Sequence, residues 1–241
     1  MINSKILLKN GNIIDENGNL EKNLSIYIDN GKIAEISREE EQEGYEVIDC
    51  TGLYVTPGFV NLHTHSPMNL LKGIAEDISI DNWFNEKIFP YESKLKTEDV
   101  YWGTIIAAAE MINNGVTAFA DHYFCQESVY RAVADIGIRG DIAPTIFGLA
   151  DDYEQQLKNA VSFVEEYRDK NSRIRLRLGP HAPYTCPGDK LKEIVDAAKK
   201  LKTGIHIHVS ETKEQVEESI RLTGKTPIEV LYESGGFDID V

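Results

Sequence analysis

Two pairs of histidines stand two residues apart in this chain, each at the end of an apolar run. His63 and His65 lie in PGFVNLHTH, and His206 and His208 lie in GIHIHVSE. Because the side chains of a strand alternate between its two faces, the members of each pair point to one face. Two imidazoles on one face can bind a metal ion, or they can form hydrogen bonds inside a core.

The other histidines have similar surroundings. His122 lies in TAFADHYF and His181 in RLRLGPHAPY, so all six histidines of the chain lie at or near the C-terminal end of an apolar, strand-like run. In α/β folds with parallel strands, active sites form at that end of the sheet. A single HxH motif is more often a packing feature, but the shared position of all six favours a metal site.

The stretches between the histidines alternate between strand and helix patterns. Alternation at this spacing indicates parallel strands with helical crossovers, in either an open doubly wound sheet or a closed (β/α)8 barrel. Removing the first 58 of the 241 residues leaves 183, below the roughly 200 residues of the smallest complete barrels. Strands are expected at 59–65, 117–123, 138–147, 174–181 and 204–210, the start of a sixth at 237–241, and helices at 97–114, 126–136, 152–169, 188–202 and 211–222.

Residues 1–58 have a different sequence pattern, in which short strand-like runs are joined by glycine and asparagine. Two NG pairs, at 10–11 and 30–31, stand between alternating apolar residues, and each predicts a hairpin turn. The PG pair that follows marks a turn out of this module. We therefore expect two domains, 1–58 and 59–241.

Charge and composition exclude several classes of partner. The formal net charge of −15 leaves no basic excess for a phosphate backbone or an anionic membrane surface, so we expect no nucleic-acid and no membrane partner. Cys50, Cys125 and Cys186 are odd in number and far apart, which indicates a reducing compartment. The apolar runs are too short to cross a bilayer, and the N-terminal stretch has no secretory signal pattern. We expect a cytoplasmic protein acting on a small molecule, with a homo-oligomer left open.

Three stretches together resemble a known family. TPGFVNLHTHSPMNLLKGIAEDISIDNWF, GPHAPYTCP and IHIHVSET are similar, in the same order, to the amidohydrolase superfamily, in the branch of 5′-methylthioadenosine/S-adenosylhomocysteine deaminases and chlorotriazine hydrolases. The resemblance covers essentially the whole chain, but only the N-terminal half, or somewhat more, of the family's usual length. It implies an α/β fold: a (β/α)8-type barrel, incomplete here with about five to six β/α units, preceded by a partial β-sandwich module at 1–58.

The resemblance also implies a metal centre. His63 and His65 would be ligands from the first barrel strand and His208 a third from the fifth, around one divalent ion, Zn²⁺ first and Fe²⁺, Ni²⁺ or Mn²⁺ as alternatives. Glu211 matches the carboxylate that moves protons to the substrate ring; a charge favoured at a helix N-terminus is the simpler role. His206 matches no ligand and is expected to pack or to support a ligand.

The substrate pocket is assigned by the same resemblance. His181 would hydrogen-bond the heterocyclic ring, while Trp83 and Glu92, in the long segment after the first strand, would line the pocket and bind ribose hydroxyls. Without the resemblance, these two would be loop packing and surface charge. The fourth strand has no Lys to bridge a second metal, so one metal is expected. Pro144 stands where adenosine-type members often have an Arg, a departure from that branch.

The reaction implied is hydrolytic deamination of an aminopurine nucleoside such as methylthioadenosine or S-adenosylhomocysteine, by water activated at the metal. Two alternatives stay open. One is another amidohydrolase reaction, such as dechlorination of a chlorotriazine or deamination of guanine or cytosine. The other is a truncated chain without activity by itself, since the family's sixth-strand His and the Asp that completes the metal site would lie beyond Val241. Asp121 and His122 receive no assignment and are expected to be structural.

Overall fold

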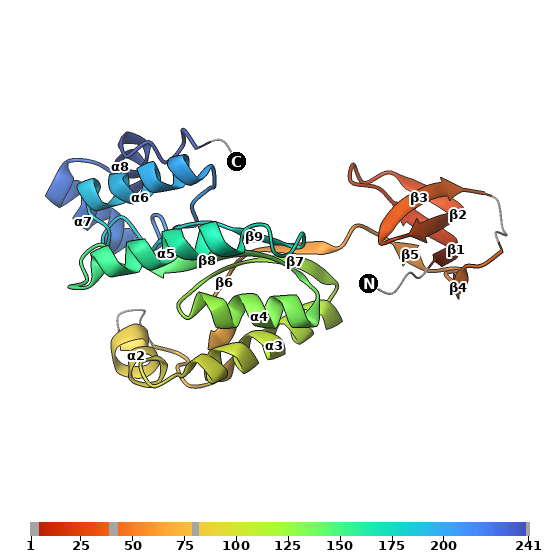
Figure 1. Cartoon of the computed structure of the whole chain (residues 1–241), viewed down its shortest axis with the longest axis horizontal. Coiled ribbons are helices and arrows are strands. Elements are labelled where there is room, and N and C mark those ends of the chain that lie inside the picture. Colours follow the sequence, from red (N-terminus) through yellow and green to blue (C-terminus); the bar gives the residue numbers. More distant parts are fainter. Residues whose placement is uncertain (1–4, 39–42, 79–81, 240–241) are drawn as a thin grey trace. The chain divides into compact units, whose positions relative to one another are not determined.

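The computed structural model describes residues 5–38, 43–78 and 82–239. By their internal contacts the residues form two compact units, Met1–Gly58 and Phe59–Val241 (Figure 1). Each unit has its own sheet.

The N-terminal unit contains one mixed sheet with the strand order β3-β2-β1-β4, in which β5 also pairs with β1. β1 runs antiparallel to β2 and parallel to β4 and β5. Leu7 and Tyr27, on the paired β1 and β2, are buried. The strands are β1 (Ile6–Ile14), β2 (Leu20–Asp29), β3 (Lys32–Ser37), β4 (Glu46–Asp49) and β5 (Tyr54–Val55).

The two NG pairs have different outcomes. The pair at 30–31 joins β2 to the antiparallel β3 with both residues at positive φ, 52° and 73°, so this hairpin prediction is confirmed. The pair at 10–11 is no hairpin turn, because β1 continues through it with a shift in register against β2. A Cβ on Gly11 would lie 2.9 Å from Val55 Cγ2. Close packing against β5 therefore requires this glycine, and the prediction of a turn there was wrong.

The second unit contains a parallel sheet with the order β10-β8-β7-β6, to which β9 adds by pairing with β8. Helices lie between β6 and β7, between β7 and β8, and between β8 and β9 (Figure 1), which confirms the predicted α/β class. The strands are β6 (Phe59–Thr64), β7 (Val116–Tyr123), β8 (Arg139–Ile146), β9 (Ile174–Leu176) and β10 (Gly179–Pro180). The helices are η1 (Ser66–Leu71), η2 (Trp83–Ile88), α2 (Phe89–Glu92), α3 (Thr97–Asn113), α4 (Gln126–Ile136), α5 (Tyr153–Tyr167), α6 (Gly188–Leu201), α7 (Lys213–Thr223) and α8 (Pro227–Glu233).

The last predicted strands are less regular than expected. The run at 174–181 divides into β9 and β10, and 204–210 forms a single parallel bridge, Ile205 with Leu178. Backbone hydrogen bonds still hold this segment beside the sheet: His206 N–H donates to Leu178 O (3.0 Å) and His208 N–H to His181 O (3.0 Å). Of the predicted sixth strand, 237–239 is not a strand, and 240–241 lies outside the described residues.

A hydrophobic core between this sheet and its helices supports the strand ends. Burial of one large apolar side chain in this core stabilises the folded chain by about 1.5–3 kcal/mol relative to leaving that side chain exposed. Strand residues alternate between burial against the helices and the opposite face, so the core fixes which side chains emerge at the sheet edge. Fully or almost fully buried members include Phe119, Val133, Ile142, Ile146, Phe163 and Ile194.

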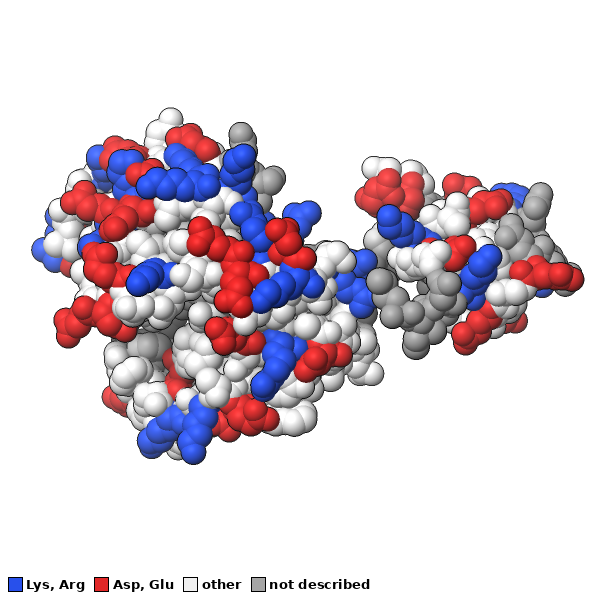
Figure 2. Space-filling model, in the orientation of Figure 1, with Lys and Arg blue, Asp and Glu red and all other residues white. Residues whose placement is uncertain are grey.

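The surface shows no concentration of basic side chains on the face drawn in Figure 2, where acidic and basic groups are interspersed. This agrees with the net charge of −15. No helix in the described part of the chain is both long enough and apolar enough to cross a bilayer.

Candidate metal centre

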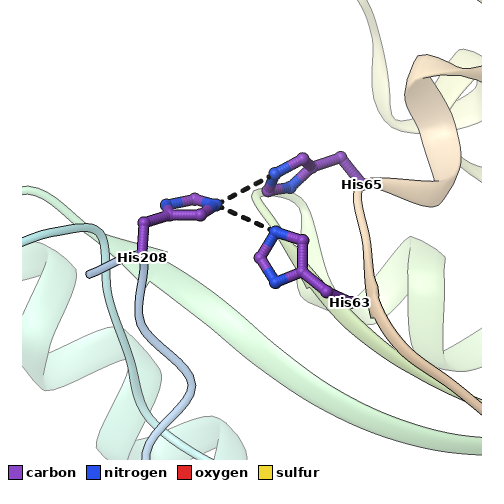
Figure 3. Close-up of side chains that lie close together, drawn as sticks. All are labelled: His63, His65 and His208. Atoms are coloured by element: carbon purple, nitrogen blue, oxygen red, sulfur yellow. Dashed lines mark hydrogen bonds between the residues drawn. The ribbon is translucent and has the colours of Figure 1, made fainter. Parts of the chain in front are cut away.

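Three imidazoles converge from two distant parts of the sequence. His63 lies in β6, His65 follows the end of that strand, and His208 follows the bridge at Ile205. The Nε2 atom of His208 lies 3.1 Å from Nε2 of His63 and 3.1 Å from Nε2 of His65 (Figure 3). One ligand nitrogen from each of the three rings lies within 4.8 Å of the others.

The other nitrogen of two of these rings faces the backbone. Nδ1 of His65 lies 2.5 Å from the carbonyl oxygen of His122, and Nδ1 of His208 lies 2.9 Å from that of His181. A carbonyl oxygen can only accept a hydrogen bond, so both Nδ1 atoms must carry the proton and donate. Each neutral ring then has its lone pair on Nε2, the nitrogen that faces the centre of the cluster.

This arrangement fits a cation. With neutral rings, the lone pairs of His65 Nε2 and His208 Nε2 face each other at 3.1 Å, where they repel unless a proton or a metal ion lies between them. A tetrahedral zinc ion with bonds of ~2.0–2.1 Å would hold its ligand nitrogens about 3.3–3.4 Å apart, which is close to the two separations of 3.1 Å found here. Three histidines that leave a fourth position open are a donor set of catalytic zinc sites, and backbone carbonyls that orient the ligands are typical of them.

His63 differs from the other two rings, because its Nδ1 lies 2.8 Å from Nε2 of His206. Burial lowers the pKa of His206 to about 4, so this ring is neutral at pH 7. Its own Nδ1 is buried and has no hydrogen-bond partner among the described residues. Burial also lowers the pKa values of His63 and His208, which favours the neutral, metal-binding form.

Glu211 lies in a short turn between the bridge segment and α7. Ser210, immediately before it, has a left-handed backbone (φ 57°), a conformation that non-glycine residues adopt mainly at constrained positions. The Glu211 side chain is exposed, and its Oε2 lies 3.4 Å from Gln215 Nε2. Its negative charge opposes the fall in the pKa values of His63 and His208. Glu211 therefore lies near His63 and His208, and its hydrogen bond in the described part of the chain is to Gln215.

Of the three residues expected at the substrate, His181 lies beside the cluster. The ring centroid of His181 is 4.9 Å from that of His208. Glu92, in α2, accepts a hydrogen bond from the Tyr123 hydroxyl (2.6 Å). Trp83, half-buried at the start of η2, makes no hydrogen bond or ring contact with the histidines in the described part of the chain.

Asp121, near the end of β7, forms hydrogen bonds to residues at the end of β6. Its Oδ1 accepts hydrogen bonds from Thr64 Oγ1 (2.8 Å) and from the backbone N–H of Ser66 (2.6 Å), the residues on either side of His65. Complete burial raises the pKa of Asp121, and these hydrogen bonds oppose that rise. The adjacent His122 is buried and directs Nε2 toward Gly179 O at 3.0 Å. Both residues therefore hold neighbouring strands in register around the site.

Tyr123 is a residue near the site that sequence reasoning missed. Its ring centroid lies 6.5 Å from that of His65, and it links Glu92 to the histidine cluster. Burial raises the pKa of Tyr123, so its hydroxyl stays protonated as a donor. Tyr123 directly follows His122 at the end of a predicted parallel strand, and this position could have indicated that it lies near the site.

The chain matches known proteins over nearly its whole length. The sequence profile of the amidohydrolase family matches residues 54–240. The chain is 41% identical over 240 residues to the 5-methylthioadenosine/S-adenosylhomocysteine deaminase of Thermoanaerobacter pseudethanolicus, covering 97% of this chain and 56% of that protein. The corresponding deaminase of Thermococcus sibiricus is 38% identical over 241 residues, covering 98% and 56%. This chain belongs to the amidohydrolase family, and it spans about half the length of the curated relatives it matches.

Solved structures match the fold. An adenosine deaminase from Xanthomonas campestris with bound zinc has a TM-score of 0.85 at 24% identity, covering 97% of this chain and 55% of that one. A guanine deaminase from C. acetobutylicum with bound guanine has a TM-score of 0.86 at 21% identity, covering 96% and 60%. The prediction of an α/β fold corresponding to part of an amidohydrolase barrel is confirmed.

Proposed function

We propose that this chain carries the metal centre and the proton-transfer carboxylate of an aminohydrolase that deaminates an aminopurine nucleoside such as methylthioadenosine or S-adenosylhomocysteine. The observation that carries the proposal is the pair of Nε2 lone pairs facing each other at 3.1 Å between His65 and His208, with His63 beside them. A cation among the three nitrogens would remove the repulsion between these lone pairs, and this supports the proposal. The sequence identity to two methylthioadenosine/S-adenosylhomocysteine deaminases supports the choice of substrate class.

His63, His65 and His208 would hold the zinc ion, which when bound would lower the pKa of water and so supply a nucleophile near neutral pH. In the proposed reaction, one Glu211 carboxylate oxygen takes a proton from the attacking water and delivers it to the ring nitrogen beside the amino-bearing carbon. A carbon–oxygen bond forms and the carbon–nitrogen bond breaks. The second proton of the water passes through the same carboxylate to the amino nitrogen, which leaves as ammonia, while the ring keeps a carbonyl group and the N–H formed in the first transfer.

His181 is suited to recognise the amino group. Thr185 Oγ1 donates to Ala182 O (3.2 Å) and so accepts from His181 Nδ1 (2.9 Å). This places the proton of His181 on Nδ1 and leaves Nε2 as an acceptor. Burial lowers the pKa of His181 to about 3, so the ring stays neutral. We assign it to accept an N–H of the substrate, and Glu92 and Trp83 to the outer part of the pocket.

The test is ammonia release by the zinc-loaded, full-length product of the gene. Methylthioadenosine, S-adenosylhomocysteine, adenosine and guanine are the substrates. We expect the Glu211→Gln variant to keep its zinc and to lose about 10²–10⁴-fold in kcat. Glu214→Gln, an exposed carboxylate in the first turn of α7, should stay close to wild type. Absence of ammonia from all four substrates, or full activity of Glu211→Gln, would contradict the proposal.

A further inference from the structure

The three candidate ligands are not oriented in the same way. Nδ1 of His65 and of His208 meets a backbone carbonyl, which fixes the proton on that nitrogen. Nδ1 of His63 instead lies 2.8 Å from Nε2 of His206. Either nitrogen of an imidazole pair can donate, so the backbone alone does not determine which nitrogen of His63 holds the proton.

We propose that His206 is a positioning residue, whose Nε2 accepts the Nδ1–H of His63 and thereby keeps the Nε2 lone pair of His63 turned toward the metal ion. The inference rests on the proposed metal centre and adds a residue that matches no ligand position. In the opposite arrangement, His206 donates from Nε2 and His63 carries its proton on Nε2. That nitrogen then has no lone pair for a cation.

The surroundings of His206 hold its ring in the required place. Its backbone N–H donates to Leu178 O (3.0 Å), which anchors the segment to the sheet. Its ring stacks on that of His122, with centroids 5.4 Å apart and planes 30° apart. The proposed tautomer puts its proton on Nδ1, the buried atom without a partner among the described residues. The unsatisfied N–H is the cost of presenting an acceptor to His63.

Two amide variants separate hydrogen bonding from packing. In His206→Gln, the amide reaches about as far as the original Nε2 and can still accept from His63. In His206→Asn, the amide ends near the position of Nδ1 and falls short. The variants are prepared in the 241-residue chain. Their zinc dissociation constants are measured by chelator competition, and their metal-free melting temperatures are the control for packing.

We expect His206→Asn to weaken zinc binding by about 10–100-fold, as for other residues that orient a ligand, and His206→Gln to bind nearly as wild type. In the zinc-loaded wild-type chain, the histidine ¹⁵N shifts should place the proton of His63 on Nδ1 and that of His206 on Nδ1. These shifts need no variant. A wild-type chain that takes up no zinc contradicts the proposed function itself. If wild type binds zinc, equal affinities of the two variants, or a proton on Nε2 of His206, overturn this inference alone.

Discussion

Replacing Gly179 by alanine tests whether the sheet holds the site as described. A Cβ at this position would lie 2.5 Å from Pro144 O and 2.7 Å from two atoms of the His122 ring, Cδ2 and Nε2. Ordinary contact begins at 3.4 Å, so the carbonyl of β8 must retreat by about 0.9 Å. That carbonyl belongs to the strand that pairs with Gly179 through Thr145, so the retreat disrupts the β8–β10 pairing.

We expect Gly179→Ala to lower the free energy of unfolding by about 2–3 kcal/mol. This is the upper end of the 1–3 kcal/mol typical of overpacking, because the new methyl group meets backbone and a buried ring. For a chain of this size the melting temperature should fall by about 4–12 °C. The matched control is Gly188→Ala at the start of α6, where the new methyl meets nothing within 4 Å. Melting of metal-free protein, followed by circular dichroism, measures both. A Gly179→Ala variant as stable as Gly188→Ala would refute the packing described around His122.

Two further predictions concern the buried polar groups. Asp121→Ala leaves the buried N–H of Ser66 without its acceptor and should lower the free energy of unfolding by about 1–3 kcal/mol. Asp121→Asn keeps an oxygen and should lower it by less. Urea denaturation measures both variants, and equal losses would count against this hydrogen bond. The metal-free chain should also lose stability as the pH falls from 6.5 to about 3, because burial holds the pKa values of His181 and His206 at about 3 and about 4 while the unfolded chain binds those protons near pH 6.5. By pH 5 each histidine should lower the free energy of unfolding by on the order of 1–2 kcal/mol. Equal urea midpoints at pH 7 and pH 5 would contradict the burial of these rings.

Part of the arrangement of the histidines could be predicted from the local sequence. The two-residue spacing of His63 and His65 predicted one shared face, and the end of a parallel strand predicted a place at the active edge. Both expectations depend only on strand geometry. The prediction of a strand at 204–210 was wrong in form, since only Ile205 forms a bridge. Hydrogen bonds to Leu178 and His181, the residues on either side of β10, still hold His208 at the cluster.

The remainder depends on contacts between distant residues. The carbonyls that fix the tautomers of His65 and His208 belong to His122 and His181, and no sequence spacing specifies that they lie within hydrogen-bond distance. The pairing of Tyr123 with Glu92 joins residues 31 apart. The NG pair at 10–11 has the local signature of a turn, and only the approach of Val55 shows why the strand continues there.

Zinc binding to the metal-free 241-residue chain, followed by X-ray absorption at the zinc edge, tests the metal centre most directly. We predict one zinc ion per chain with three imidazole nitrogens at about 2.0–2.1 Å, and loss of this signal in the His65→Ala and His208→Ala variants. Zinc that is absent, or bound without imidazole and unaffected by these substitutions, would contradict the convergence of the three histidines on a single cation.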